Sequence, residues 1–188
     1  MSKHGAPLRA ILRPPTGRRS PAALTALALL VAGGSGCGAS AQRSEPLAAW
    51  LSFDTSTKTV SLRLIAAYNN VYGGFNFNGY GKGQVLVEVP RGWRVNVRCV
   101  NNSTTMRHSC AIVRGVSGRT PAFPGAASPG AQYGLPPKHK AAFSFLATRV
   151  GTYRIVCLVP AHEQEGMWDV LDVTHDRTPA VVLLRHPR

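Results

Sequence analysis

Apolar and polar residues alternate along most of the chain after residue 58, in short runs separated by Gly, Pro and Asn. Alternation with a period of two is typical of β-strands that bury one face. Between residues 92 and 100, for example, Val95 and Val97 fall on one face while Arg94 and Asn96 fall on the other. The clearest strands are predicted at residues 59–68, 84–89, 92–100, 107–114, 141–148, 151–157 and 168–174.

About seven or eight short strands with turn signals between them predict an all-β fold, a sandwich or barrel, rather than an α/β fold. Residues 115–140 are rich in Gly, Pro, Ala and Ser, and this segment is too long for a simple hairpin loop. We expect it to be an ordered excursion over one end of the sandwich, since long loops in compact domains tend to be functional. The apolar run at residues 180–184 fits either an extra edge strand or a loosely held tail.

The N-terminal residues have the features of an export signal. The first 36 residues contain five basic residues and no acidic residue, and residues 22–32 form an apolar run too short to span a bilayer as a stable helix. Cys37 follows a stretch of small residues, as at a bacterial lipoprotein cleavage site, so it is a candidate for lipidation. Ordinary cleavage and retention as an uncleaved anchor are the alternatives.

These patterns predict an export signal at residues 1–37, a linker at 38–48, a single β domain at 49–175 and a C-terminal tail at 176–188. The expected location is periplasmic, or on the outer face of the cytoplasmic membrane, where a lipid or the signal itself would anchor the chain.

The formal net charge is +14, and removing the basic signal leaves 17 basic against eight acidic residues, a net charge of +9. A basic surface favours acidic proteins, anionic lipids or nucleic acid as partners. An exported chain rarely meets nucleic acid, and the sequence has no cluster of basic and aromatic residues that could form a stacking platform. We therefore expect partner proteins with acidic surfaces and no nucleic acid.

Three metal-binding side chains follow one another closely near the C-terminal end of the domain. Cys157 ends a predicted strand, His162 follows five residues later, and Met167 follows five residues after that. His108 lies on a separate predicted strand 49 residues before Cys157. A trigonal site of two His and one Cys with a weak axial Met is typical of blue-copper proteins, because soft sulfur suits reduced copper and imidazole serves both oxidation states.

Each of these residues, taken alone, fits an ordinary structural role. A Cys at a strand end is more often a small buried apolar residue, and a lone Met or His more often belongs to the core. Zinc is the competing metal, but structural zinc normally recruits four Cys or His ligands, often in CxxC pairs, and this sequence has no such pair. The order and spacing of the four residues together favour copper.

The segment from Cys157 to Asp169 resembles the copper loop of sulfocyanin, a membrane-associated cupredoxin of respiratory chains. Residues 74–80, with the sequence GFNFNGY, are similar to that family's Asn- and Gly-rich segment, and residues 123–126 also fit. His108 followed by Ser109 matches its first ligand. The resemblance covers about residues 50–173, and rusticyanin is a close relative with the same ligand spacing.

This resemblance implies a cupredoxin-like Greek-key sandwich with a single type 1 copper centre that passes one electron at a time. The implied partners are cytochromes or a terminal oxidase. It further implies that Ser109 braces the ligand loops, that Trp168 belongs to the apolar shell around the copper, and that electrons enter through His162. The surface around His162 would then be formed by Val159, Pro160 and Ala161.

A copper storage or delivery protein would share these ligands and is the alternative function. An enzyme is not expected, because the sequence contains no HxH pair for a second copper site. Cys99 and Cys110 depart from the family pattern. They could form a disulfide in an oxidising compartment, but we favour two free buried thiols, because the sequence does not show that their geometry permits a bond.

Overall fold

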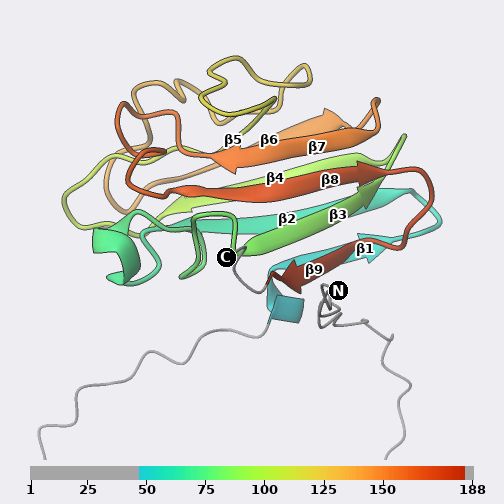
Figure 1. Cartoon of the computed structure of the whole chain (residues 1–188), viewed down its shortest axis with the longest axis horizontal. Coiled ribbons are helices and arrows are strands. Elements are labelled where there is room, and N and C mark those ends of the chain that lie inside the picture. The colour runs from blue at the N-terminus through green and yellow to red at the C-terminus, as the bar shows by residue number, and fades with distance from the viewer. Residues whose placement is uncertain (1–46, 185–188) are drawn as a thin grey trace, which may run out of the picture.

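A computed structural model of the chain describes residues 47–184, which form a β-sandwich of two mixed sheets (Figure 1). One sheet has the strand order β1-β2-β4-β6 and the other has the order β5-β7-β8-β3-β9. The predicted all-β sandwich is therefore confirmed. The nine strands in this part of the chain are β1 (Leu51–Asp54), β2 (Thr59–Ala66), β3 (Val85–Pro90), β4 (Arg94–Asn101), β5 (Ala111–Val113), β6 (Lys140–Leu146), β7 (Gly151–Val156), β8 (Trp168–Thr174) and β9 (Ala180–Leu183).

The four-stranded sheet buries one face and exposes the other, as the alternating pattern predicts. In β4, Val95 and Val97 are buried, whereas Arg94 and Asn96 are exposed. Strand β2 runs parallel to β4 and buries its own alternate residues, beginning with Val60. Strand β1 was not predicted, because its four residues are too few to show a clear alternation.

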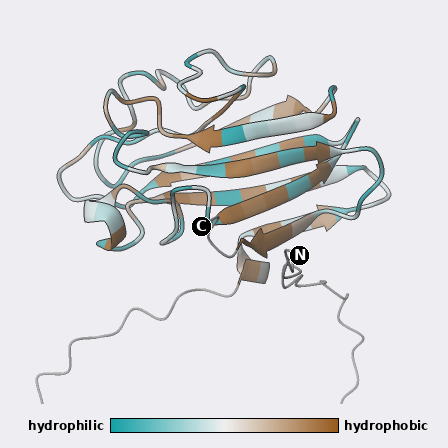
Figure 2. Ribbon diagram, viewed as in Figure 1, coloured by the Kyte–Doolittle hydropathy of each residue, from teal (hydrophilic) through white to brown (hydrophobic). Residues whose placement is uncertain are grey.

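The five-stranded sheet has β3 between β8 and β9, and β3 is hydrophobic over most of its length (Figure 2). Strand β9 pairs antiparallel with β3, so the apolar run near the C-terminus is an edge strand rather than a loose tail. The sheet therefore extends beyond residue 175, the predicted end of the domain. The predicted strand at residues 107–114 is shorter than expected, since only Ala111–Val113 pairs with β7.

The long segment after β5 is ordered and packs onto the sandwich, as predicted. Phe123 from this segment is buried, and its ring lies 5.3 Å from Phe145 of β6 and 4.8 Å from Tyr153 of β7. The same segment lies along the edge of β5, where Ile112 donates a backbone hydrogen bond to Ala126. An irregular segment thus covers an edge that a tenth strand could otherwise occupy.

The predicted export signal, Cys37 and most of the predicted linker lie outside the described residues. A short 3₁₀ helix, η1 (Leu47–Ala49), precedes β1, and a second, η2 (Val71–Gly74), follows β2. Among residues 47–184, no helix is long and apolar enough to cross a membrane.

Candidate metal centre

One end of the sandwich brings His108, Cys157 and His162 together from two separate parts of the chain. Cys157 directly follows β7, His162 lies in the loop between β7 and β8, and His108 lies between β4 and β5. One ligand atom from each of the three side chains lies within 4.8 Å of the other two. The loops that carry them lie at the left of Figure 1.

His108 is fully buried and is held through its backbone. Its N–H donates to the carbonyl of Leu135 over 3.3 Å, and its carbonyl accepts from the Leu135 N–H over 2.7 Å. Gly134 permits this close approach, because a side chain there would lie 3.0 Å from the His108 nitrogen. Neither ring nitrogen of His108 has a hydrogen-bond partner among the described residues. A buried imidazole without a partner is costly unless another group, such as a metal ion, uses its lone pair.

The sulfur of Cys157 lies in a hydrogen-bonded, buried position. It accepts a hydrogen bond from the Ser109 N–H over 3.2 Å, and it lies 3.4 Å from Nδ1 of His162. The Ser109 hydroxyl accepts from the Leu158 N–H over 2.9 Å, so Ser109 joins the segment that contains His108 to the segment that contains Cys157. Ser109 therefore contacts both the Cys157 sulfur and the backbone of the residue that follows it.

Burial determines the protonation of the three side chains when no metal is bound. Desolvation raises the pKa of the Cys157 thiol, against the smaller effect of its hydrogen bonds with Ser109 and Val159. Desolvation, with a smaller contribution from His162, lowers the pKa of His108 to about 4. The pKa of His162 is also lowered by burial, although Glu165 opposes the shift. Both imidazoles are therefore neutral near pH 7, the form that binds metal ions.

Met167 is fully buried at the end of the same loop. Its N–H donates to the carbonyl of His162 over 3.0 Å, and its carbonyl accepts from the Cys157 N–H over 3.3 Å. The backbone therefore ties Met167 to both His162 and Cys157. Trp168 follows it as the first residue of β8 and is half-buried.

His162 lies nearer the surface than the other two residues. It is half-buried, while Pro160 and Ala161 beside it are exposed and Val159 is half-buried. Phe75 packs edge-on against the His162 ring, with the ring centroids 4.9 Å apart. Phe75 was not predicted to belong to the site, since its only signal in the sequence was its place in the Asn- and Gly-rich segment.

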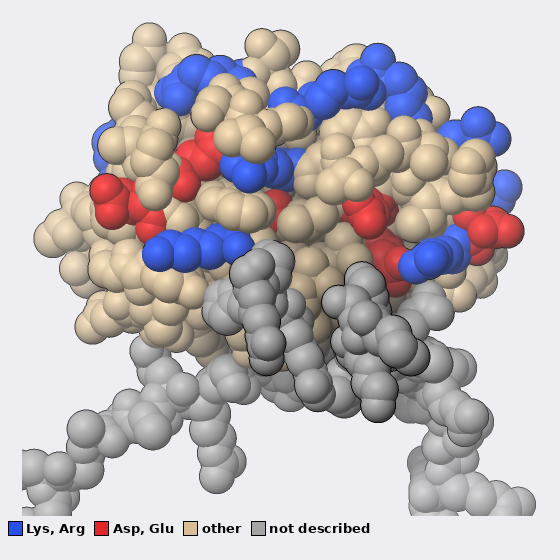
Figure 3. Space-filling view, viewed as in Figure 1, with Lys and Arg blue, Asp and Glu red and all other residues tan. Residues whose placement is uncertain are grey.

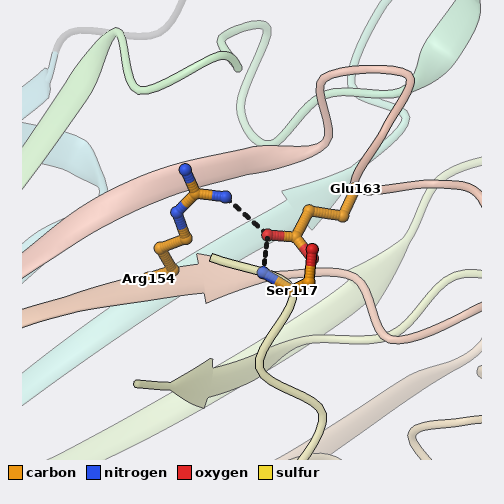
Figure 4. Close-up of polar contacts among 3 residues, drawn as sticks. All are labelled: Ser117, Arg154 and Glu163. Atoms are coloured by element: carbon orange, nitrogen blue, oxygen red, sulfur yellow. Dashed lines mark hydrogen bonds and ion pairs between the residues drawn. The ribbon is translucent and has the colours of Figure 1, made fainter. Parts of the chain in front are cut away.

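Two further residues near the site could not be recognised from the sequence. Arg154 of β7 forms an ion pair with Glu163, the residue after His162, and the Glu163 carboxylate also accepts from the Ser117 N–H (Figure 4). No motif marks this contact, because it joins a strand to two irregular loops.

Cys99 and Cys110 form a disulfide, with their Cα atoms 5.9 Å apart. The preference for two free thiols was therefore wrong. The sequence could not reveal that the end of β4 and the residues after His108 face each other across the sandwich. Among the described residues, Cys157 is the free cysteine.

The donor set fits copper. Two neutral imidazoles and one cysteine sulfur in a buried position form the donor set that type 1 copper uses, and the two unpartnered ring nitrogens of His108 leave a donor available. The hydrogen bond from the Ser109 N–H restricts where the Cys157 sulfur can lie.

Comparison with known proteins agrees with this chemistry. The model of the Sulfocyanin (SoxE) domain matches residues 46–182. Sulfocyanin from Sulfolobus acidocaldarius is 27% identical over 139 residues, which cover 67% of this chain and 69% of that protein.

Two solved structures are also similar to this chain. Reduced auracyanin from Roseiflexus castenholzii is 23% identical, with a TM-score of 0.47 over 61% of this chain and 96% of its own. Rusticyanin from Thiobacillus ferrooxidans is 20% identical, with a TM-score of 0.44 over 67% of this chain and 88% of its own. Because the family match covers well over half of the sequence and contains the whole His-Cys-His cluster, the chain belongs to the sulfocyanin family of blue copper proteins.

Proposed function

We propose that this chain is a one-electron carrier in which His108, Cys157 and His162 would hold a single type 1 copper ion, with Met167 as a weak fourth ligand. The observation that carries the proposal is the buried His-Cys-His cluster, whose ligand atoms lie within 4.8 Å of one another. Bound copper would supply a reversible one-electron couple.

The protein's own part is to bind the copper ion, to orient its ligands and to shield them from water. Cys157 and Met167 are buried, which excludes water from the sulfur ligands. His108 is fixed by Leu135, and Cys157 by Ser109, so the ligands are held in place independently of the metal. Ligands held on a rigid framework change position little between oxidation states, which favours fast electron transfer.

Electrons would enter through His162, the ligand residue nearest the surface. Val159, Pro160 and Ala161 form an apolar surface beside it, and Tyr133, which is 69% exposed, lies on the loop that packs against Val159. A small apolar contact of this kind suits a weak partner that releases quickly. Trp168 would belong to the apolar surroundings that tune the copper potential.

The partners we propose are respiratory proteins with acidic docking surfaces, such as cytochromes or a terminal oxidase, outside the cytoplasmic membrane. The signal-like N-terminal sequence and the net charge of +9 that remains without it support this proposal. A lipid on Cys37 or the uncleaved signal would anchor the chain to the membrane.

The alternative is a copper storage or delivery protein, and metal exchange separates the two functions. A carrier should take up and release one electron per copper in a redox titration while a copper chelator removes the metal slowly from both oxidation states. Rapid loss of copper to the chelator, with no reversible one-electron step, would instead assign the chain to storage or delivery.

A further inference from the structure

The loop between β7 and β8 is held from outside by a charged pair that takes no part in ligation. The Arg154 guanidinium donates to the Glu163 carboxylate over 2.6 Å (Figure 4). The same carboxylate oxygen accepts from the Ser117 N–H over 3.3 Å. The two side chains are only 18% and 11% exposed, so solvent screens the pair less than an ordinary surface ion pair.

Arg154 makes a second contact at the other end of the loop. Its guanidinium lies over the Trp168 ring, 3.9 Å from the ring centroid. Glu163 directly follows His162, and Trp168 directly follows Met167. One planar group thus contacts the neighbours of two proposed ligands at once, and Arg154 itself stands three residues before Cys157. Lysine could form the ion pair but could not stack its charged group in the same way.

Residues 117–119, which follow β5, also hold the loop between β7 and β8. Besides the Ser117 contact, the Arg119 guanidinium donates to the Leu158 carbonyl over 3.0 Å, at the start of the same loop. The loop is therefore tied at residues 158, 163 and 168 by groups that are not ligands. A partly buried ion pair is a weak source of stability, because desolvation offsets much of the attraction. The ion pair therefore contributes more by restricting the position of the loop than by stabilising the fold.

We propose that Arg154 is the positioning residue of the copper loop, fixing His162 relative to Met167 by binding Glu163 and stacking on Trp168 at the same time. This inference rests on the proposed function, because it takes His162 and Met167 as copper ligands. Loss of these two Arg154 contacts should leave the copper bound but let His162 and Met167 change position when the copper changes oxidation state.

The test compares the copper-loaded full chain with the variants Arg154→Met, Arg154→Lys and Glu163→Gln. Electron self-exchange should slow by about tenfold in Arg154→Met, the change that ~1.4 kcal/mol of additional barrier produces. The reduction potential should shift and the copper hyperfine splitting should widen. Arg154→Lys should give an intermediate effect, since it keeps the charge but loses the stacked plane. If Arg154→Met does not fold, the milder Glu163→Gln variant provides the same readouts.

The chain offers a control ion pair at the opposite end of the sandwich, although its arginine is more exposed, at 63% against 18% for Arg154. Arg177 forms an ion pair with Glu88, also at 2.6 Å. Arg177→Met should lower stability without changing self-exchange, potential or hyperfine splitting. If Arg154→Met or Glu163→Gln loses stability but keeps all three copper properties, as this control does, the positioning role is wrong while the proposed function survives. If the unmodified chain forms no blue centre, the proposed function itself fails.

Discussion

At the scale of single residues, the chemistry of the site depends on a proton that the metal must displace. Burial raises the pKa of the Cys157 thiol, so the thiol is protonated near pH 7 when no metal is bound. His108 and His162 are neutral there, because burial lowers the pKa of each. A copper ion binds thiolate and neutral imidazole, so the only proton that binding removes comes from Cys157.

Copper uptake at pH 7 should therefore release about one proton per ion. The measurement is a copper titration of the metal-free protein in weak buffer with a pH indicator. Cys157→Ser should release none. If the unmodified protein also releases none, the thiol is already ionised, contrary to the shift described above.

Asp169 is a second buried residue with an unusual protonation state. Its carboxylate oxygen accepts a hydrogen bond from the Val85 N–H over 3.0 Å, but burial raises the pKa of the side chain to about 8. The folded protein thus keeps a proton that the unfolded chain, with a pKa of 3.8, releases as the pH rises. The stability associated with this proton is complete below pH 3.8 and is lost as the pH rises towards 8.

We expect Asp169→Asn to remove this loss, because an amide keeps the acceptor for Val85 and carries no charge. Urea unfolding of the metal-free protein between pH 5 and 8 should show the free energies of unfolding of the two proteins diverging by up to about 1.4 kcal/mol per pH unit. Parallel pH profiles would show that Asp169 does not titrate in this range.

At the scale of elements, the disulfide joins a strand of one sheet to the residue that precedes a strand of the other sheet. Cys99 lies in β4, and Cys110 directly precedes β5. His108 stands two residues before Cys110, but the Leu135 and Ser109 hydrogen bonds hold the site independently of the disulfide.

Replacing both cysteines with alanine should therefore lower the free energy of unfolding by about 3 kcal/mol, the value for a closed loop of this length, without changing the copper absorption band. Thermal unfolding and the optical spectrum measure the two effects separately. A shifted band would mean that the disulfide also shapes the copper site.

The elements show which parts of the fold a sequence can reveal. Strands such as β4 were predictable, because one buried face imposes strict alternation on them. Strand β9 was not, since an apolar run fits an edge strand and a tail equally well. The His-Cys-His cluster was predictable because its chemistry restricts the residue types. The Arg154–Glu163 pair was not, because a contact between a strand and an irregular loop depends on the path of the backbone.

At the scale of the whole molecule, charge should govern the encounter with partners. On the face shown in Figure 3, Lys and Arg are dispersed and Asp and Glu lie among them. The attraction of an anionic partner should therefore depend on the basic groups nearest the copper loop. Lys82 is one of these, because its side chain packs against Gly166 of that loop.

The rate at which hexacyanoferrate(III), an anion, oxidises the reduced protein should fall as salt is added. Lys82→Gln should lower both the rate and its dependence on salt. Lys58→Gln is the matched control, since Lys58 is also an exposed lysine but lies in the turn before β2, at the far end of the sandwich. Equal effects of the two substitutions would show that only the overall charge matters.

The most direct test of the central claim is the optical and electron paramagnetic resonance spectrum of the full chain loaded with copper(II), beside Cys157→Ser. A type 1 site held by Cys157 predicts an intense blue band from the thiolate and a narrow copper hyperfine splitting, both lost in the variant. A pale protein with an ordinary copper spectrum that is unchanged by the substitution would contradict the claim.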